Sequence, residues 1–201
     1  MLKRLIASPF FYLILPPLFW STNAVAGRWV AGDLPPVALS FWRWGLALAI
    51  LAPIGLPRLW AQRHTARALL GRMVPLAVFS VTSFNTLLYT ALETTTALNA
   101  TLISTSMPIV MVLLSWLILR ESTGPRQAVG IALAFAGVLL VISRGEAAVL
   151  LAWQPVPGDL VALAAVGSWA LYSVLLKRSG SAVSALDPLA MLTLLIFLGT
   201  T

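Results

Sequence analysis

The residues of this chain that are most capable of chemistry lie inside long apolar stretches. Arg43 stands about seven residues, or ~10 Å of helix, beyond Pro36 within one such stretch. A cation at that depth in a bilayer is costly unless it reaches the headgroups or a partner. Two interpretations stay open: an anchor for an anionic group such as a substrate carboxylate, or a structural arginine that reaches the outer headgroups beside Trp42 and Trp44.

Other hydrogen-bonding side chains recur in the apolar stretches at helical spacing. Asn23 shares a helix face with Trp20, and Asn85 shares one with Tyr89. Such side chains could line a passage for a small polar solute, or they could bridge neighbouring helices. Both interpretations stay open for the two asparagines and the tyrosine. The candidate substrate-binding residues are Trp20, Asn23, Arg43, Asn85, Tyr89, Trp169 and Tyr172.

The chain offers little for catalysis or for metal binding. It has no cysteine and one histidine, His64, which lies in a basic connection. Its six acidic residues lie near the ends of the apolar stretches. A membrane enzyme acting on lipid substrates needs clustered His, Asp or Glu, usually with a metal. We therefore expect no enzyme activity, no catalytic residue, no metal and no cofactor. Coupling to protons stays undecided, with Glu93 as the candidate carboxylate.

Six apolar stretches and the beginning of a seventh must position these residues. About 20 apolar residues are needed for a helix to cross a bilayer. The stretches are Leu5–Gly27, Leu34–Pro57, Met73–Leu92, Thr94–Leu119, Gln127–Ser143 and Leu160–Leu176, followed by Pro188 onward. Hydrophobic residues make up 60% of the 201 and charged residues 9%, too few to cover a water-facing surface. These features predict an all-α, polytopic transmembrane helix bundle.

The cations predict how this bundle is oriented. With the N-terminus in the cytoplasm, ten Lys and Arg fall in inside segments, and only Arg28 and Arg144 fall outside. This placement argues against a nucleic-acid partner despite the net charge of +7. The N-terminal stretch also resembles a secretory signal that ends at Ala24-Val25-Ala26, but removing it would break the alternation of charges. We expect it to be retained as a helix.

One pattern occurs twice in the chain. A Trp is followed by a hydrogen-bonding residue three positions later and by a cation eight positions later, in Trp20-Asn23-Arg28 and in Trp169-Tyr172-Lys177. An Asp and Pro that begin the next helix follow each copy, which gives offsets of 149 residues for the Trp and 152 for the Pro. Such a unit spans five helices, so its copies enter the membrane in opposite orientation, as in secondary transporters. We expect a first repeat over 1–143, a linker over 144–158 and the start of a second repeat over 159–201.

The order of these motifs resembles the EamA-type branch of the drug/metabolite transporter superfamily. The resemblance rests on Tyr89–Ala97, Ser106-Met107-Pro108, Leu119-Arg120-Glu121, Gln127–Gly130 and Ala136-Gly137-Val138. It implies a ten-helix carrier of the bacterial inner membrane that moves small metabolites, amino acids or organic toxicants, usually outward, by alternating access. Trp20 and Trp169 would then form paired aromatic walls.

Since the resemblance implies two five-helix halves, we expect the sequence, which stops within its seventh helix, to be a fragment or a truncated gene product. A non-transporting fragment or an accessory membrane subunit is the alternative function. Expected partners are the lipid bilayer and a small polar or amphipathic solute, and a homodimer is left open.

Overall fold

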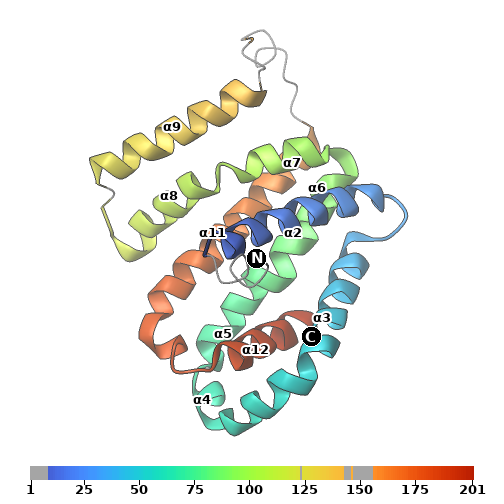
Figure 1. Ribbon diagram of the computed structural model, residues 1–201, viewed down its shortest axis with the longest axis vertical. Coiled ribbons are helices and arrows are strands. Elements are labelled where there is room, and N and C mark those ends of the chain that lie inside the picture. The colour runs from blue at the N-terminus through green and yellow to red at the C-terminus, as the bar shows by residue number, and fades with distance from the viewer. Residues whose placement is uncertain (1–8, 123, 143–145, 147–155) are drawn as a thin grey trace, which may run out of the picture.

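The computed structural model describes residues 9–122, 124–142, 146 and 156–201, which are almost entirely helical (Figure 1). Its elements are α2 (Pro9–Trp29), α3 (Pro36–Ala61), α4 (Arg63–Ala68), α5 (Leu70–Ala77), the π-helical segment η1 (Val78–Ser83), α6 (Phe84–Thr94), α7 (Ala97–Ser104), α8 (Met107–Leu119), α9 (Pro125–Ile142), α11 (Pro157–Val183) and α12 (Pro188–Thr200). The predicted all-α fold is confirmed. Most of the predicted linker, and the cations Lys3, Arg4 and Arg144, lie outside the described residues.

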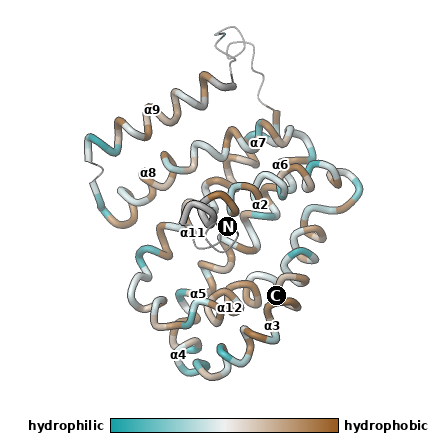
Figure 2. The backbone as a smooth tube through the Cα atoms, viewed as in Figure 1, coloured by the Kyte–Doolittle hydropathy of each residue, from teal (hydrophilic) through white to brown (hydrophobic). Residues whose placement is uncertain are grey.

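Four helical segments are long and apolar enough to cross a membrane: Pro36–Ala61, Leu70–Thr94, Ala97–Leu119 and Pro157–Val183. They coincide with the predicted second, third, fourth and sixth crossings. α2 and α9 lie where the first and fifth crossings were predicted, and the shorter α12 lies where the seventh begins. The membrane crossing of these three helices stays a prediction. Figure 2 shows hydrophilic residues gathered at the short helix α4 and at the α8–α9 connection.

Two of the crossings are not continuous α-helices. The third contains η1, whose wider turn is typical of functional sites in helices. Side chains supply donors to two of its carbonyls: Ser168 Oγ donates to Phe79 O at 2.8 Å, and Asn85 Nδ2 donates to Ser80 O at 3.4 Å. The fourth is interrupted between α7 and α8, where Pro108 lies in the first turn of α8 and its missing N–H costs nothing.

α11 is the central helix of the bundle. It packs against α6, α7, α8 and η1, while α12 packs against α3, α5 and η1. The most deeply buried apolar side chains include Met73, Leu76, Leu92 and Val166. Gly55 of α3 lies directly against Thr193 of α12, so that a β-carbon at position 55 would collide with the threonine side chain. This close approach lets α12 pack directly against α3.

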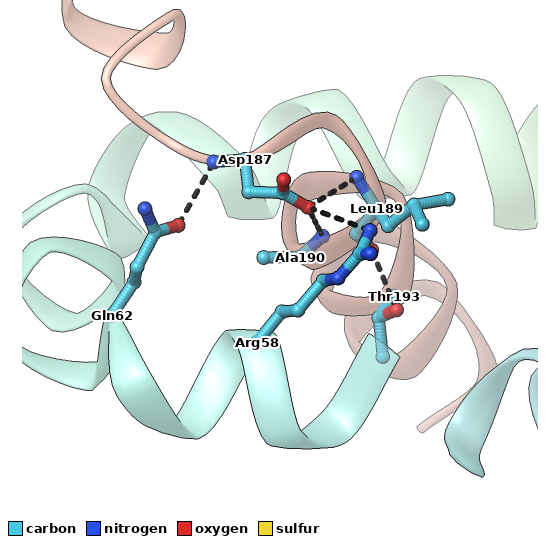
Figure 3. A network of polar contacts seen from close by, with 6 residues as sticks. All are labelled: Arg58, Gln62, Asp187, Leu189, Ala190 and Thr193. Atoms are coloured by element: carbon cyan, nitrogen blue, oxygen red, sulfur yellow. Dashed lines mark hydrogen bonds and ion pairs between the residues drawn. The ribbon is translucent and has the colours of Figure 1, made fainter. Parts of the chain in front are cut away.

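Polar contacts at the helix ends join segments that were predicted on the same side. Asp187 Oδ1 lies 3.7 Å from Arg58 Nη1 and accepts hydrogen bonds from the Leu189 and Ala190 N–H groups, which caps α12 (Figure 3). The Asp187 N–H donates to Gln62 Oε1 at 2.8 Å. All these residues belong to predicted inside segments or to the helix that follows one.

A second contact of the predicted inner side pairs Lys177 with Glu121. In the predicted outer segments, Thr95 Oγ1 donates to Asp159 Oδ1. Inside segments therefore contact inside segments, and outside segments contact outside ones, as alternating crossings require. Which side faces the cytoplasm stays a prediction.

Candidate functional site

Three of the predicted site residues meet in one hydrogen-bonded group, which we call the Asn23 hub. Asn23 of α2 accepts two hydrogen bonds at Oδ1, from Arg43 Nη1 of α3 at 2.9 Å and from the Tyr89 hydroxyl of α6 at 2.7 Å. A guanidinium can only donate, so the amide atom that faces it must be the oxygen. The hub thus joins three helices through a single acceptor.

Close packing of α2 on α6 positions this hub. A β-carbon at Gly27 would lie 2.9 Å from ring carbons of Tyr89, so glycine permits the approach that brings the tyrosine hydroxyl to Asn23. One residue further, Arg28 Nη1 donates to the carbonyls of Leu92 and Glu93 at the end of α6. A cation at the carboxyl end of a helix satisfies its free carbonyls and complements the helix dipole. These contacts hold the carboxyl-terminal end of α2 against α6.

The charge of Arg43 is not neutralised within the described part of the chain. Its Cζ lies 4.7 Å from the ring centroid of Trp44, a cation–π contact. No carboxylate among the described residues lies within ion-pair distance of it. Its Nε and the indole Nε1 of Trp44 are buried, and neither has an acceptor among those residues. Arg43 therefore carries a full positive charge, and its Nε–H group donates to no described residue.

Most of the hydrogen-bonding groups that the Asn23 hub leaves without a partner are donors. The Oδ1 atom of Asn23 is occupied by two donors, whereas its NH₂ group has no acceptor among the described residues. The guanidinium and the Trp44 indole add further N–H groups. Carboxylates and other acceptor-rich groups complement such a set, and hydrogen bonds between ionised partners are the stronger ones. The charge of Arg43 and these donors match an anionic group in chemical type, and the buried Nε and Nε1 atoms become reachable only if the helices around them separate.

Three aromatic side chains surround Trp169 of α11. Trp20 meets it edge to face at a centroid distance of 5.6 Å, Tyr172 lies at 5.2 Å, and Phe84 lies at 4.9 Å. The two tryptophans that the predicted internal repeat aligns are therefore in direct contact. Trp20 is 52% exposed, so part of its surface is available to another molecule. This cluster offers an apolar wall with the geometry that aromatic rings prefer.

Asn85 lies apart from both groups. It is 2% exposed, and its Nδ2 donates to Ser80 O beside the π-helical turn. Its Oδ1 is buried without a donor among the described residues. A solute reaches this amide only if the helices around it separate. Its role in binding stays a prediction.

The acidic residues lie where they were predicted, near the helix ends. Glu93 is exposed at the end of α6. Asp159 is 4% exposed, but it accepts hydrogen bonds from Thr95 Oγ1 and from the Val156 N–H at 3.1 Å, which caps α11. No group of three or more metal-binding side chains occurs among the described residues.

Sequence reasoning missed two participants in these groups. Trp44 was named only as a neighbour of Arg43 near the outer headgroups, in one of the two open interpretations, yet its ring lies under the guanidinium and its indole N–H is buried. Adjacent residues point about 100° apart on a helix, so their positions alone did not indicate this contact. Phe84 was missed because a phenylalanine in an apolar stretch carries no signal of its own.

Comparison with known proteins agrees with this architecture. Residues 7–143 match the EamA-like transporter family. The uncharacterized transporter YyaM of Bacillus subtilis (strain 168) is 29% identical over 80% of this chain and 53% of its own length. An uncharacterized transporter of Archaeoglobus fulgidus is 28% identical over 81% of this chain and 55% of its own. The chain thus spans about half the length of these curated relatives, and no solved structure matches it. Because the family match covers most of the chain and several helices can span a membrane, this multi-pass membrane protein belongs to the EamA-like transporter family.

Proposed function

We propose that this protein exports a small metabolite that carries a carboxylate or a similar acceptor-rich group. Amino acids fit this description, and so do organic toxicants that carry an acidic group. The protein would lie in the bacterial inner membrane with its N-terminus in the cytoplasm and would work by alternating access. The observation that carries the proposal is the uncompensated guanidinium of Arg43 between α2, α3 and α6.

The surroundings of Arg43 support an anchor for cargo over a purely structural role. A structural arginine in a membrane gains most from a carboxylate or from the headgroups. Arg43 instead contacts an amide oxygen and the face of an indole, and neither neutralises its charge. An anionic cargo would supply the missing charge and would use the N–H groups that remain. Binding of such a cargo would therefore offset the cost of a cation that no described carboxylate neutralises.

The aromatic cluster supports an amphipathic cargo. Trp20 precedes Asn23 by three residues on α2, so the cluster and the hub lie about one helical turn apart. A solute with its anionic group at the hub could place an apolar portion against Trp20 and Trp169. Tyr172, at the position that corresponds to Asn23 in the second repeat, would offer a hydroxyl on the far side of this wall. The contact between the two aligned tryptophans also supports the inverted repeat over 1–143 and 159–201.

Transport into liposomes tests the proposal most simply. We would compare each amino acid with its amide, because the amide keeps the shape of the solute and removes the negative charge. We expect the acid to enter at least about ten times faster, since 1.4 kcal/mol of charge-dependent binding corresponds to that factor. Equal rates for acid and amide would contradict the assignment of cargo class. Absence of transport by the folded protein would favour the alternative of an accessory subunit.

The variant Asn23→Asp distinguishes an effect on cargo binding from an effect on protein stability. The new carboxylate would occupy the position of Oδ1, still accept from Tyr89, and neutralise Arg43. We expect this variant to be at least as stable as the wild type and to lose its preference for the acid. Arg67→Gln, which removes an exposed cation of α4, is the matched control and should behave as the wild type. An Asn23→Asp variant that transports the acid at the wild-type rate would refute the role of the hub.

A further inference from the structure

The π-helical segment η1 lies between the two α-helical parts of the third crossing and is bonded to a neighbouring helix. It joins α5 to α6, and the Ser168 hydroxyl of α11 donates to its Phe79 O at 2.8 Å. A second side-chain donor, Asn85 Nδ2, lies 3.4 Å from Ser80 O, which is long for a hydrogen bond. Ser168 therefore makes the shorter and better bond to this segment.

The wide turn of η1 sets how α6 is rotated. A π-helical turn takes one more residue than an α-helical turn, because its hydrogen bonds join residues five positions apart. Each residue of an α-helix turns the chain by about 100°, so one extra residue rotates all of α6 relative to α5 by about that angle. The direction in which Tyr89 points therefore depends on η1.

Burial along the crossing agrees with such a rotation. Met73 of α5 is fully buried, and counting 3.6 residues per turn from it brings the buried face to about positions 84 and 87. Asn85 and Tyr89 are instead the more deeply buried, at 2% and 3% exposed. Phe84 and Leu88, which lie nearer the expected face, are each 8% exposed. The buried face is thus displaced by about one residue after η1, toward the side of α6 that carries Tyr89.

We propose that Ser168 is a positioning residue for the Asn23 hub. Its bond to Phe79 O holds η1 in the wide turn, and this turn directs the Tyr89 hydroxyl to Asn23. Without the bond, η1 would relax toward the commoner α-helical turn, and Tyr89 would rotate away from α2. Ser168 acts through the backbone of η1, since no hydrogen bond joins it to the hub among the described residues.

The same bond connects the two predicted repeats. Ser168 lies in the second, next to Trp169 of the aromatic cluster, whereas η1 and the hub lie in the first. A movement of α11 during transport would reach the hub through this bond, and Tyr89 would then leave the acceptor that it shares with Arg43. This consequence for the cargo rests on the proposed function, whereas the positioning of Tyr89 does not.

Fluorine NMR of the full chain, labelled with 3-fluorotyrosine in detergent micelles, tests the positioning without any cargo. The chain has three tyrosines, so Tyr89→Phe identifies the signal of Tyr89. In Ser168→Ala we expect that signal to move most of the way to its position in Asn23→Ala, where the hydroxyl has lost its acceptor. Ser173→Ala is the matched control and should leave the signal in place, because Ser173 also lies on α11 but donates to Trp169 O of the same helix.

Stability gives a second measurement that needs no label. The decrease in the unfolding midpoint caused by Tyr89→Phe should shrink to about half or less in the Ser168→Ala background, and should be unchanged in the Ser173→Ala background, because independent sites are additive. An unmoved Tyr89 signal in Ser168→Ala would overturn the inference, and so would additive midpoints or an equal response in Ser173→Ala. Neither measurement involves transport, so such a failure is distinct from a failure of the comparison between acid and amide.

Discussion

Asn23 Oδ1 accepts two hydrogen bonds in the hub. Removing this acceptor should destabilise the protein more than removing one of its two donors. Asn23→Ala deletes the bond from the charged Arg43 and the bond from the Tyr89 hydroxyl. Bonds to charged groups contribute about 1.5–3 kcal/mol and neutral ones about 0.5–1.5 kcal/mol, and values inside membranes average about 0.6 kcal/mol. We therefore expect Asn23→Ala to lower the free energy of unfolding by about 2–3 kcal/mol. Tyr89→Phe, which deletes one neutral bond, should lower it by about 0.6–1.5 kcal/mol.

Reversible unfolding in mixed micelles of mild detergent and dodecyl sulfate measures both changes. Once Asn23 is alanine, the additional change Tyr89→Phe should cost almost nothing, because its hydrogen bond is already absent. Thr90→Val is a control, since Thr90 Oγ1 donates only to Thr86 O of its own helix. The geometry of the hub would be refuted if Tyr89→Phe cost more than Asn23→Ala, or if the two changes were additive.

Three further predictions concern the helix ends and the segments that connect the crossings. Asp187→Ala removes the cap of α12 and should lower the free energy of unfolding by about 0.5–2 kcal/mol, while Asp187→Asn should keep most of the capping; equal losses in both would point to Arg58 instead. The hydrogen bond from Lys177, and then that from Ser115, lowers the pKa of Glu121 below its usual value of 4.5, so its contribution to stability should be present above that pH and vanish as the pH falls through the lowered pKa; a wild type that differed from Glu121→Gln equally at all pH values would contradict this. The chain has no cysteine, so an impermeant maleimide should label Asp33→Cys on intact cells and Thr65→Cys only after permeabilisation; labelling of both on intact cells would break the alternation.

Much of the fold could be predicted because the bilayer imposes a length and a composition on each crossing. The apolar stretches located the long helices, and the cations between them indicated which connections share a side, whereas the short helix α4 lies in a predicted connection. The contacts of Asp187 with Arg58 and of Lys177 with Glu121 agree with that assignment. The π-helical turn at Val78–Ser83 could not be predicted. Its residues are ordinary for a helix, and donors such as Ser168, 89 residues away, contact its carbonyls.

The candidate site was predictable by residue but not by arrangement. Helical spacing placed Asn23, Asn85 and Tyr89 on interior faces, yet it could not indicate that one amide oxygen would serve two donors. Asn85 has the same periodicity as Tyr89, but its side chain binds a carbonyl of the same crossing. Tertiary contacts between helices decide these outcomes, and local sequence does not contain them.

The central claim is that the guanidinium of Arg43 holds an anionic cargo during transport. Counterflow of a radiolabelled amino acid into liposomes, measured for wild type, Arg43→Lys and Arg43→Gln at equal amounts of folded protein, tests it directly. We predict that Arg43→Lys keeps part of the initial rate because it keeps the charge, and that Arg43→Gln falls at least about tenfold because it does not. An Arg43→Gln variant that exchanges the amino acid as fast as the wild type would contradict the claim.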